Sequence, residues 1–287
     1  MADLLSAAAG APPESPTWYP SPYLRVLFIG DSLDKHLMQG FCRLDKNRTK
    51  IKWLVHKQSG TGICRGAALT VANYRIFGLA RPSQQYLLPK YEKRQPISQT
   101  WDTYYRLSTM LKRDMPDATS FDAIVLHSGV WDLSRPTTTT DPVRLATVRE
   151  YHAAVRNISQ LMRRQFPRSK IFWRSGPPVG HRDSAPKGKA FVTRTVKSQH
   201  VLHSALKDAV NRERRAGNVD GDVLDWFGML TGYTYLAAAD RNKIHYPEIV
   251  DLAFLNLFLN ALRVRMATVP RRQTQRLAHA RTERIGH

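Results

Sequence analysis

Apolar residues along the chain fall into two patterns, short dense runs and longer stretches with a helical period. The dense runs, which predict buried strands, are 24–30, 51–56, 121–129, 170–173 and 222–226. The periodic stretches, which predict helices, are 33–44, 66–79, 98–115, 142–166, 191–215 and a last one that starts at Pro247. Strands that alternate with helices at this spacing predict βαβ units and a parallel sheet that is covered on both faces.

One domain accounts for most of the chain. Residues 23–265 are expected to form a three-layer α/β/α domain around a mainly parallel, five-stranded sheet, a flavodoxin-like arrangement. Residues 1–22 are rich in Ala, Pro and Ser and predict a disordered leader without the basic start of a signal peptide. Residues 266–287 are basic and lack an apolar period, which predicts a disordered tail that contacts an anionic surface. No stretch is predicted to cross a membrane.

Ser32 occupies the most informative position, where the first predicted strand stops at Gly30 and the first helix begins. Open α/β sheets bind ligands at the carboxyl ends of their strands, and a helix start offers unpaired N–H groups and a partial positive charge to an anion. The position therefore favours a catalytic hydroxyl. The alternative is that Ser32 or Asp31 only caps the helix, as these residue types often do.

The charge of the chain adds a second class of partner. The chain has 44 basic and 23 acidic residues and a net charge of +21, so its surface attracts polyanions such as nucleic acid, anionic lipid or acidic glycan. The basic residues are spread along the sequence, and no zinc-finger spacing, RNP pattern or leucine heptad accompanies them. Nucleic-acid binding is therefore not expected as the main role.

The cysteines and histidines do not form a recognisable metal motif. Cys42 and Cys64 lack metal-ligand spacing and are expected to be free thiols, which favours a reducing, cytoplasmic compartment, although a single bridge between them stays open. His200 and His203 lie one helical turn apart and could bind a metal, but no third ligand is in view. No metal and no cofactor is predicted.

Three short blocks, each at the end of a predicted strand or the start of a helix, share a pattern with a known family. They are Gly30-Asp31-Ser32 after the first strand, Ser-Gly-Val-Trp-Asp-Leu-Ser-Arg at 128–135 after a middle strand, and Ile-His-Tyr at 244–246 before the last helix. In this order they resemble the SGNH (GDSL) hydrolase superfamily, and more narrowly its PC-esterase branch. The resemblance spans residues 24–265 and implies a three-layer α/β/α fold.

The resemblance also implies a serine esterase mechanism. Ser32 would be the nucleophile, and His245 would be the general base that takes its proton and returns it to the leaving group. The N–H groups of Ser32 and of Gly60, or alternatively of Gly62, would form the oxyanion hole together with the side chain of Trp131. A serine hydroxyl needs such an imidazole to become a good nucleophile, and donors aimed at the oxyanion give a large rate term.

Two residues depart from the family pattern. Trp131 stands where the family usually has an oxyanion-binding asparagine, so an indole N–H would have to donate instead. Asn242 stands three residues before His245, where the family has the aspartate that orients the histidine. An amide can accept the imidazole N–H but cannot balance the imidazolium charge. Asp240 could take this role, and otherwise the site is a Ser–His dyad or a slow or lapsed catalyst.

Four further residues are assigned to substrate binding because they border the predicted site: Gly129, Asp132, Arg135 and Arg174. The two arginines could hold an anionic substrate group, or be ordinary solvated surface residues. Asp132 has a structural alternative, which is to anchor the turn at the strand end through backbone N–H groups. His127, inside a predicted strand, is expected to be a buried histidine with its hydrogen bonds satisfied.

Together these observations predict a hydrolase that acts on a small acyl ester or an acylated glycan through an acyl-serine intermediate. An O-acyltransferase that passes the acyl group to a sugar hydroxyl would use the same site. A third alternative is a non-catalytic protein of this fold that binds polyanions, through its basic tail among other surfaces; Asn242, Trp131 and the net charge favour it.

Overall fold

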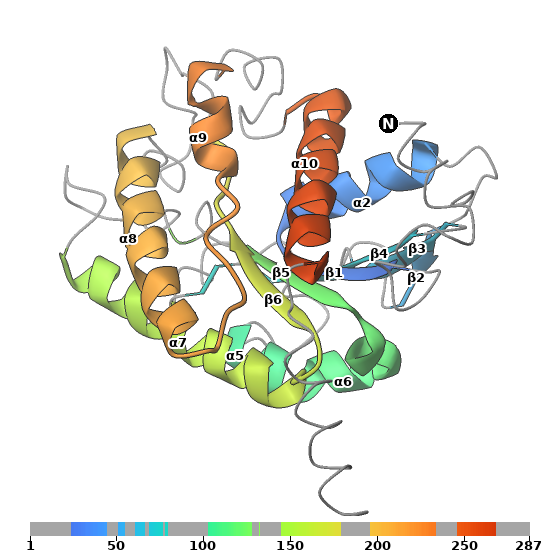
Figure 1. Cartoon of the computed structure of the whole chain (residues 1–287), viewed down its shortest axis with the longest axis horizontal. Helices are drawn as coiled ribbons and strands as arrows, with labels where there is room; N and C mark the ends of the chain where they lie inside the picture. Colours follow the sequence, from blue (N-terminus) through green and yellow to red (C-terminus); the bar gives the residue numbers. More distant parts are fainter. Residues whose placement is uncertain are drawn as a thin grey trace, which may run out of the picture.

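The central feature of the fold is a six-stranded sheet with helices on both faces (Figure 1). A computed structural model describes residues 24–44, 51–54, 61–66, 69–76, 78–79, 103–127, 132, 145–178, 196–233 and 246–267 of the chain. The strands are β1 (Leu24–Gly30), β2 (Lys52–Trp53), β3 (Gly62–Arg65), β4 (Leu69–Arg75), β5 (Ala123–His127) and β6 (Lys170–Arg174).

The order of the strands across the sheet is β2-β3-β4-β1-β5-β6. β1 pairs in parallel with both β4 and β5, and β5 pairs in parallel with β6. The antiparallel pairs of the described sheet, β2 with β3 and β3 with β4, lie at one side. The mainly parallel sheet expected from the sequence is thus confirmed, with one strand more than the five expected. The carboxyl ends of β1, β4, β5 and β6 consequently meet at one rim.

The longer helices form where the apolar period predicts them, apart from the segment 66–79, which is described below. They are α2 (Ser32–Leu44), α5 (Thr103–Tyr105), the π-helical turn η4 (Arg106–Met110), α6 (Leu111–Asp114), the 3-10 turn η5 (Pro116–Ser120), α7 (Leu145–Gln165), α8 (Val196–Arg215), α9 (Trp226–Leu230) and α10 (Glu248–Ala267). The predicted helix over 98–115 is therefore seen as the consecutive pieces α5, η4 and α6.

Two apolar clusters fill the space between the sheet and its helices. One cluster joins the sheet to α6, α7 and α8 through residues such as Ile29, Tyr151 and Leu206. The other joins the opposite face to α2, α9 and α10 through residues such as Phe28 and Trp226. Neighbouring residues of β1 contribute to different clusters because successive side chains of a strand point to opposite faces. The predicted three-layer α/β/α architecture is therefore confirmed (Figure 1).

The helix predicted over 66–79 is wrong. Residues 69–75 form β4, which lies between β1 and β3. Its first six residues are all buried, because the sheet is covered on both faces at this strand. A strand buried on both faces lacks the alternation of apolar and polar residues that marks a half-exposed strand, and its apolar run cannot be told from a helix by periodicity.

The strand predicted over 222–226 is also shorter than expected. Leu224 forms an isolated parallel bridge with Arg174, and its N–H donates to the carbonyl of Trp173 over 2.8 Å. The helix α9 begins directly afterwards, at Trp226, with the side chain of Asp225 accepting the N–H of Gly228 as a cap. This cap ends the extended run after a single bridge.

Cys42 and Cys64 form a disulfide, which corrects the expectation of free thiols. Their Cα atoms lie 5.8 Å apart, within the range that a disulfide spans. Both residues are buried, and the bond joins α2 to β3 although 22 positions separate the two residues. The sequence alone could not bring them together, because their contact depends on where α2 packs on the sheet.

The predicted leader, residues 1–22, lies outside the described residues. So does the predicted tail, except for its first two residues, which belong to the end of α10. Among the described residues, no helix combines the length and the apolar character that a bilayer crossing requires.

Candidate active site

The start of α2 places Ser32 at the carboxyl end of the central strand. Ser32 is the first residue of α2 and is half-buried. The side chain of Asp31 accepts the N–H of Leu33 over 2.9 Å, so Asp31 makes the capping contact at this helix start. Ser32 itself therefore lies where the helix offers N–H groups and a partial positive charge to an anion.

Gly30 ends β1 and lets a carboxylate lie against the end of the strand. A Cβ atom at this position would lie 1.8 Å from one carboxylate oxygen of Asp34. The carbonyl of Gly30 also accepts the N–H of Ile76 over 2.7 Å, which ties the end of β1 to the chain that leaves β4. The glycine is thus required by the close approach of Asp34.

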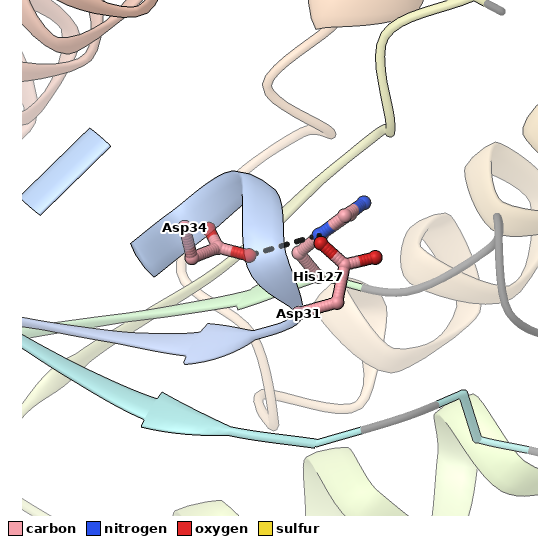
Figure 2. A group of neighbouring side chains, drawn as sticks. All are labelled: Asp31, Asp34 and His127. Atoms are coloured by element: carbon pink, nitrogen blue, oxygen red, sulfur yellow. Dashed lines mark hydrogen bonds and ion pairs between the residues drawn. The ribbon is translucent and has the colours of Figure 1, made fainter. Parts of the chain in front are cut away.

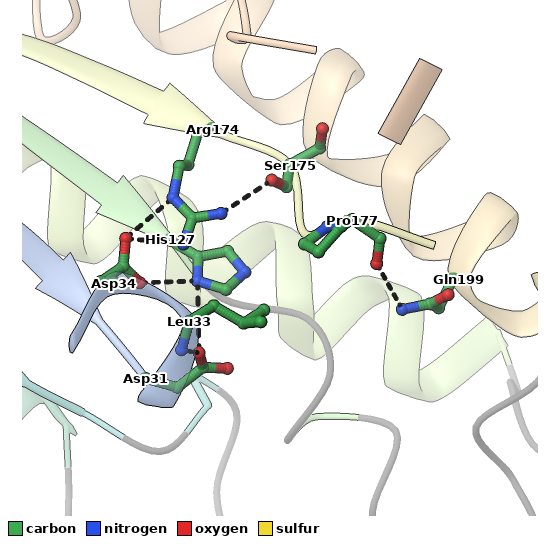
Figure 3. A network of polar contacts seen from close by, with 8 residues as sticks. All are labelled: Asp31, Leu33, Asp34, His127, Arg174, Ser175, Pro177 and Gln199. Carbon is green, nitrogen blue, oxygen red and sulfur yellow. Dashed lines mark hydrogen bonds and ion pairs between the residues drawn. The ribbon is translucent and has the colours of Figure 1, made fainter. Parts of the chain in front are cut away.

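Asp34, on the first turn of α2, is the centre of a buried polar network. One of its oxygens, Oδ2, lies 2.9 Å from Nδ1 of His127, at the end of β5 (Figure 2). The other, Oδ1, accepts a hydrogen bond from Nε of Arg174 over 2.8 Å and lies 2.6 Å from Nη2 of that guanidinium. The side chains of all three residues have no exposed surface. The network joins α2 to the ends of β5 and β6 (Figure 3).

The charges in this network offset one another. Burial acts to raise the pKa of Asp34, but the charge of Arg174 and the hydrogen bonds from His127 and Arg174 outweigh it and lower the pKa below its ordinary value. Asp34 is therefore a carboxylate, so Nδ1 of His127 carries the proton and donates it to the shared hydrogen bond. Within the described part of the chain, Nε2 of His127 is buried and has no hydrogen-bond partner. An imidazole oriented by a carboxylate in this way can accept a proton at its second nitrogen.

Aromatic rings surround the other side of Arg174. Its guanidinium carbon lies 4.7 Å from the ring centre of Trp226 and 5.6 Å from that of Phe254. Its Nη1 donates to the carbonyl of Ser175 over 3.2 Å, which fixes the chain that leaves β6. The guanidinium is thus held by cation–π contacts, by a carboxylate and by the backbone.

Asp31, Asp34 and His127 also form a group whose ligand atoms lie within 4.8 Å of one another, a spacing that a metal ion could bridge. However, both oxygens of Asp34 already bind protein groups, and one of these groups is the cationic guanidinium of Arg174. A second cation at the same carboxylate would be repelled by that charge. The donor set therefore fits an ion-pair network better than a metal centre.

Three other contacts tie the segments near the candidate residues to the same rim. The hydroxyl of Thr61, the residue after Gly60, accepts the N–H of Arg75 at the end of β4 over 3.3 Å. The hydroxyl of Tyr246, the residue after His245, donates to the carbonyl of Pro178 beyond β6 over 2.8 Å. These contacts bring the flanks of two remote candidates to the edge of the sheet where Ser32 lies.

Asp132 belongs to the third contact. Its side chain is buried and accepts the N–H of Leu79 over 2.8 Å. A Cβ atom on the neighbouring Gly78 would lie 2.9 Å from the same oxygen, so the glycine makes room for the carboxylate. Asp132 thus has a structural contact, but with the remote segment that follows β4 and not with the turn after its own strand, which the sequence had suggested.

Several candidate residues lie outside the described part of the chain: Gly60, Gly129, Trp131, Arg135, Asp240, Asn242 and His245. Their predicted roles stay predictions. Gly62, the alternative to Gly60, lies inside β3 opposite Trp53 and Asn73. A Cβ atom there would lie 3.0 Å from the Trp53 ring, so close packing between strands already accounts for this glycine.

The structure places Arg174 differently from the sequence-based expectation. Its guanidinium was expected beside the site, ready for an anionic substrate group, but it is fully buried and binds Asp34. His127 is buried as expected, and only one of its two ring nitrogens is hydrogen-bonded. Asp34 was missed altogether, because an acidic residue in the first turn of a helix is a common dipole-compensating feature and its partners are remote in sequence.

His200 and His203 have aromatic and ionic neighbours. Nε2 of His203 lies 3.2 Å from a carboxylate oxygen of Asp225, and its ring stacks on Phe227 with centres 5.0 Å apart. The hydrogen bond from His203 lowers the pKa of Asp225 to about 2. The ring centre of His200 lies 5.9 Å from the same phenylalanine. These contacts explain the histidine pair without a metal.

No protein-family model matches the sequence, and comparison with curated proteins gives no significant match. Solved structures do share the fold. A lipase/acylhydrolase from Enterococcus faecalis is 13% identical with a TM-score of 0.46, over 84% of this chain and 96% of its own. A carbohydrate acetylesterase from Sinorhizobium meliloti is 11% identical with a TM-score of 0.46, over 84% and 99%. A third structure, whose description names no protein, is 13% identical with a TM-score of 0.50, over 84% and 97%.

The likeness to the third structure supports the predicted three-layer α/β/α fold. At these identities the likeness extends to the fold alone.

Proposed function

We propose that the protein is a serine hydrolase of the SGNH type that cleaves a carboxylic ester through an acyl-serine intermediate. The observation that carries the proposal is the position of Ser32, at the carboxyl end of the central strand and at the first residue of α2. Asp31 accepts the N–H of Leu33 at this helix start, so the residue before the serine makes a capping contact. The esterases and acylhydrolases that share the fold support the same reaction class.

In the proposed reaction, the hydroxyl oxygen of Ser32 attacks the ester carbonyl while His245 accepts its proton. His245 then returns the proton to the leaving alcohol, and water resolves the acyl-serine. The N–H groups of Ser32 and Gly60, with the indole of Trp131, stabilise the oxyanion. Asp240 or Asn242 orients the imidazole. Acylated glycans are the proposed substrates, and a sugar hydroxyl in place of water would make the enzyme an O-acyltransferase.

The first experiment compares the purified protein with Ser32→Ala on p-nitrophenyl acetate. Loss of the nucleophile is expected to reduce turnover by at least about 10³-fold, because oxyanion donors and binding alone give only a small residual rate. A fluorophosphonate probe is expected to label the wild-type protein and not the variant. Equal rates and no labelling would contradict the proposal and favour a non-catalytic, polyanion-binding protein of this fold.

His127, which is hydrogen-bonded to the buried Asp34, is the alternative candidate for the general base. His245→Ala is expected to abolish fluorophosphonate labelling while leaving the melting temperature unchanged. His127→Gln is expected to lower the melting temperature, because it disturbs the buried network, but to leave labelling of the folded protein intact. The reverse pattern would assign the base to His127.

The residue that orients His245 is tested separately. Asn242→Asp is expected to raise turnover if residue 242 orients His245, because a carboxylate balances the imidazolium charge.

A further inference from the structure

A groove of about 290 Å³ lies between α7 and α8. The helices pack side by side on the sheet face opposite to α2, the helix that carries Ser32 (Figure 1). The residues that line the groove are Arg149, His152, Ala153 and Arg156 of α7, and Ala209, Arg212 and Glu213 of α8. Apart from two adjacent pairs, these positions are three, four or seven residues apart within each helix, so each set occupies one helix face. The groove is therefore separate from the candidate active site.

The shape of the groove follows from the sizes of its side chains. Ala153 and Ala209 are small, so they leave space where the two helices face each other. The arginines come from the same two helix faces. The lining therefore combines small apolar side chains with long cationic ones.

The three arginines of the groove are exposed and lack carboxylate partners among the described residues. Neighbouring arginines on the same helices behave differently: Arg163 pairs with Asp220, and Arg214 pairs with Asp222. No such ion pair is seen for Arg149, Arg156 or Arg212 in the part of the chain that the structure describes. Their charges are therefore available to a ligand.

His152 also suits an anion in the groove. Its Nε2 is buried and has no hydrogen-bond partner among the described residues, so an oxygen of a bound ligand that accepts from its N–H can satisfy it. Glu213 is the single carboxylate of the lining. It is buried, and its Oε2 accepts a hydrogen bond from Nδ2 of Asn218 over 2.8 Å. Three cationic groups thus face one carboxylate that is already hydrogen-bonded.

We propose that this groove binds a sulfate or phosphate ester group of an anionic ligand. Guanidinium groups present planar pairs of N–H donors that match the oxygens of sulfate and phosphate, and three arginines line this groove. Among the described lining residues there is no Phe, Tyr or Trp, whereas proteins that bind single-stranded nucleic acid place such rings under the bases. The inference does not depend on the proposed esterase activity, since the two sites lie on opposite faces of the sheet.

The test compares two triple variants with equal net charge. The groove variant is Arg149→Gln, Arg156→Gln and Arg212→Gln. The control variant is Arg164→Gln, Arg168→Gln and Arg215→Gln, which removes three exposed arginines near the same helices but outside the groove. Calorimetric titration at 150 mM salt uses a heparin tetrasaccharide for sulfate esters and inositol hexakisphosphate for phosphate esters, because this salt concentration screens distant charges. Melting temperatures establish that both variants are folded.

The groove variant is expected to bind at least one probe about tenfold or more weakly than the wild-type chain does. The affinity of the control variant is expected to stay within about twofold of wild type. The probe whose binding is weakened identifies sulfate or phosphate as the preferred group. The imidazole NMR signal of His152, assigned by its loss in His152→Gln, is expected to shift when the probe is added. Equal weakening in both variants would mean that binding follows net charge alone and would overturn the proposal. Absence of binding to both probes, or tighter binding of an RNA oligomer of equal charge, would also overturn it.

Discussion

The charge of Arg174 acts on two buried carboxyl groups, Asp34 on α2 and Asp251 on α10, but their pKa values shift in opposite directions. Asp34 binds Arg174 and His127 directly, and the pKa of Asp34 is lowered even though burial acts to raise it. Asp251 is also buried, but its Oδ1 has no hydrogen-bond partner among the described residues. Burial raises the pKa of Asp251 to about 8, against the opposing charge of Arg174. In these two residues, direct hydrogen-bond donors have a greater effect than the depth of burial on whether the carboxyl group is charged.

The largest expected effect is at Asp34. Asp34→Asn leaves the buried guanidinium of Arg174 without its counter-charge, and removing one partner of a buried pair typically costs about 3–5 kcal/mol of unfolding free energy. Urea denaturation at pH 7 measures the loss. The matched control is Asp208→Asn, an exposed residue of α8 that is expected to change stability by less than about 0.5 kcal/mol. A loss of less than 1 kcal/mol at Asp34 would mean that the network adds little to stability.

The effect at Asp251 is expected to have the opposite sign. Because its pKa is raised to about 8 in the folded protein, the folded state keeps a proton that the unfolded chain releases near the ordinary value of 3.8. The unfolding free energy therefore falls as pH rises between these values. Asp251→Asn cannot ionise, so it is expected to be more stable than the wild-type chain at pH 8, with a smaller gain at pH 5. Urea titrations at both pH values check this, and a gain independent of pH would contradict it.

The contribution of Asp34 to the unfolding free energy is expected to depend on pH in the opposite direction. A lowered pKa adds stability above the ordinary value of 3.8, and this contribution is lost as pH falls through the lower folded value. Comparing the Asp34 and Asp251 variants between pH 3 and pH 8 separates the two contributions, because they titrate in different windows.

The smallest expected effect concerns the ion pair of Arg43 and Glu248, which joins α2 to α10 at the surface. Both side chains are substantially exposed, so Glu248→Gln is expected to change stability by less than about 0.5 kcal/mol. The charge of Glu248 acts to raise the pKa of Asp251 and that of Arg43 acts to lower it. Glu248→Gln and Arg43→Gln should therefore move the Asp251 titration in opposite directions, as followed by carboxyl carbon NMR. Shifts in the same direction would indicate a structural change instead.

The sequence predicted the layers of the fold because apolar periodicity reports which faces are buried. It misassigned β4, because a strand covered on both faces has no polar side to reveal its period. It located Ser32 at the strand end from local signals alone, a glycine stop followed by an amphipathic helix. It could not foresee the pairing of Asp34 with Arg174, which lie 140 positions apart, or the bond between Cys42 and Cys64. Such contacts depend on how helices pack on the sheet, which no local window contains.

The central place of β1 has a consequence for synthesis. Among the described strands, β1 leaves the ribosome first, yet both of its neighbours, β4 and β5, follow later in the chain. Non-local parallel pairs of this kind form slowly, because the intervening loop must close first. A nascent chain that stops before residue 127 has the serine but not the completed sheet edge around it. A released N-terminal fragment is therefore expected to lack the assembled rim around Ser32.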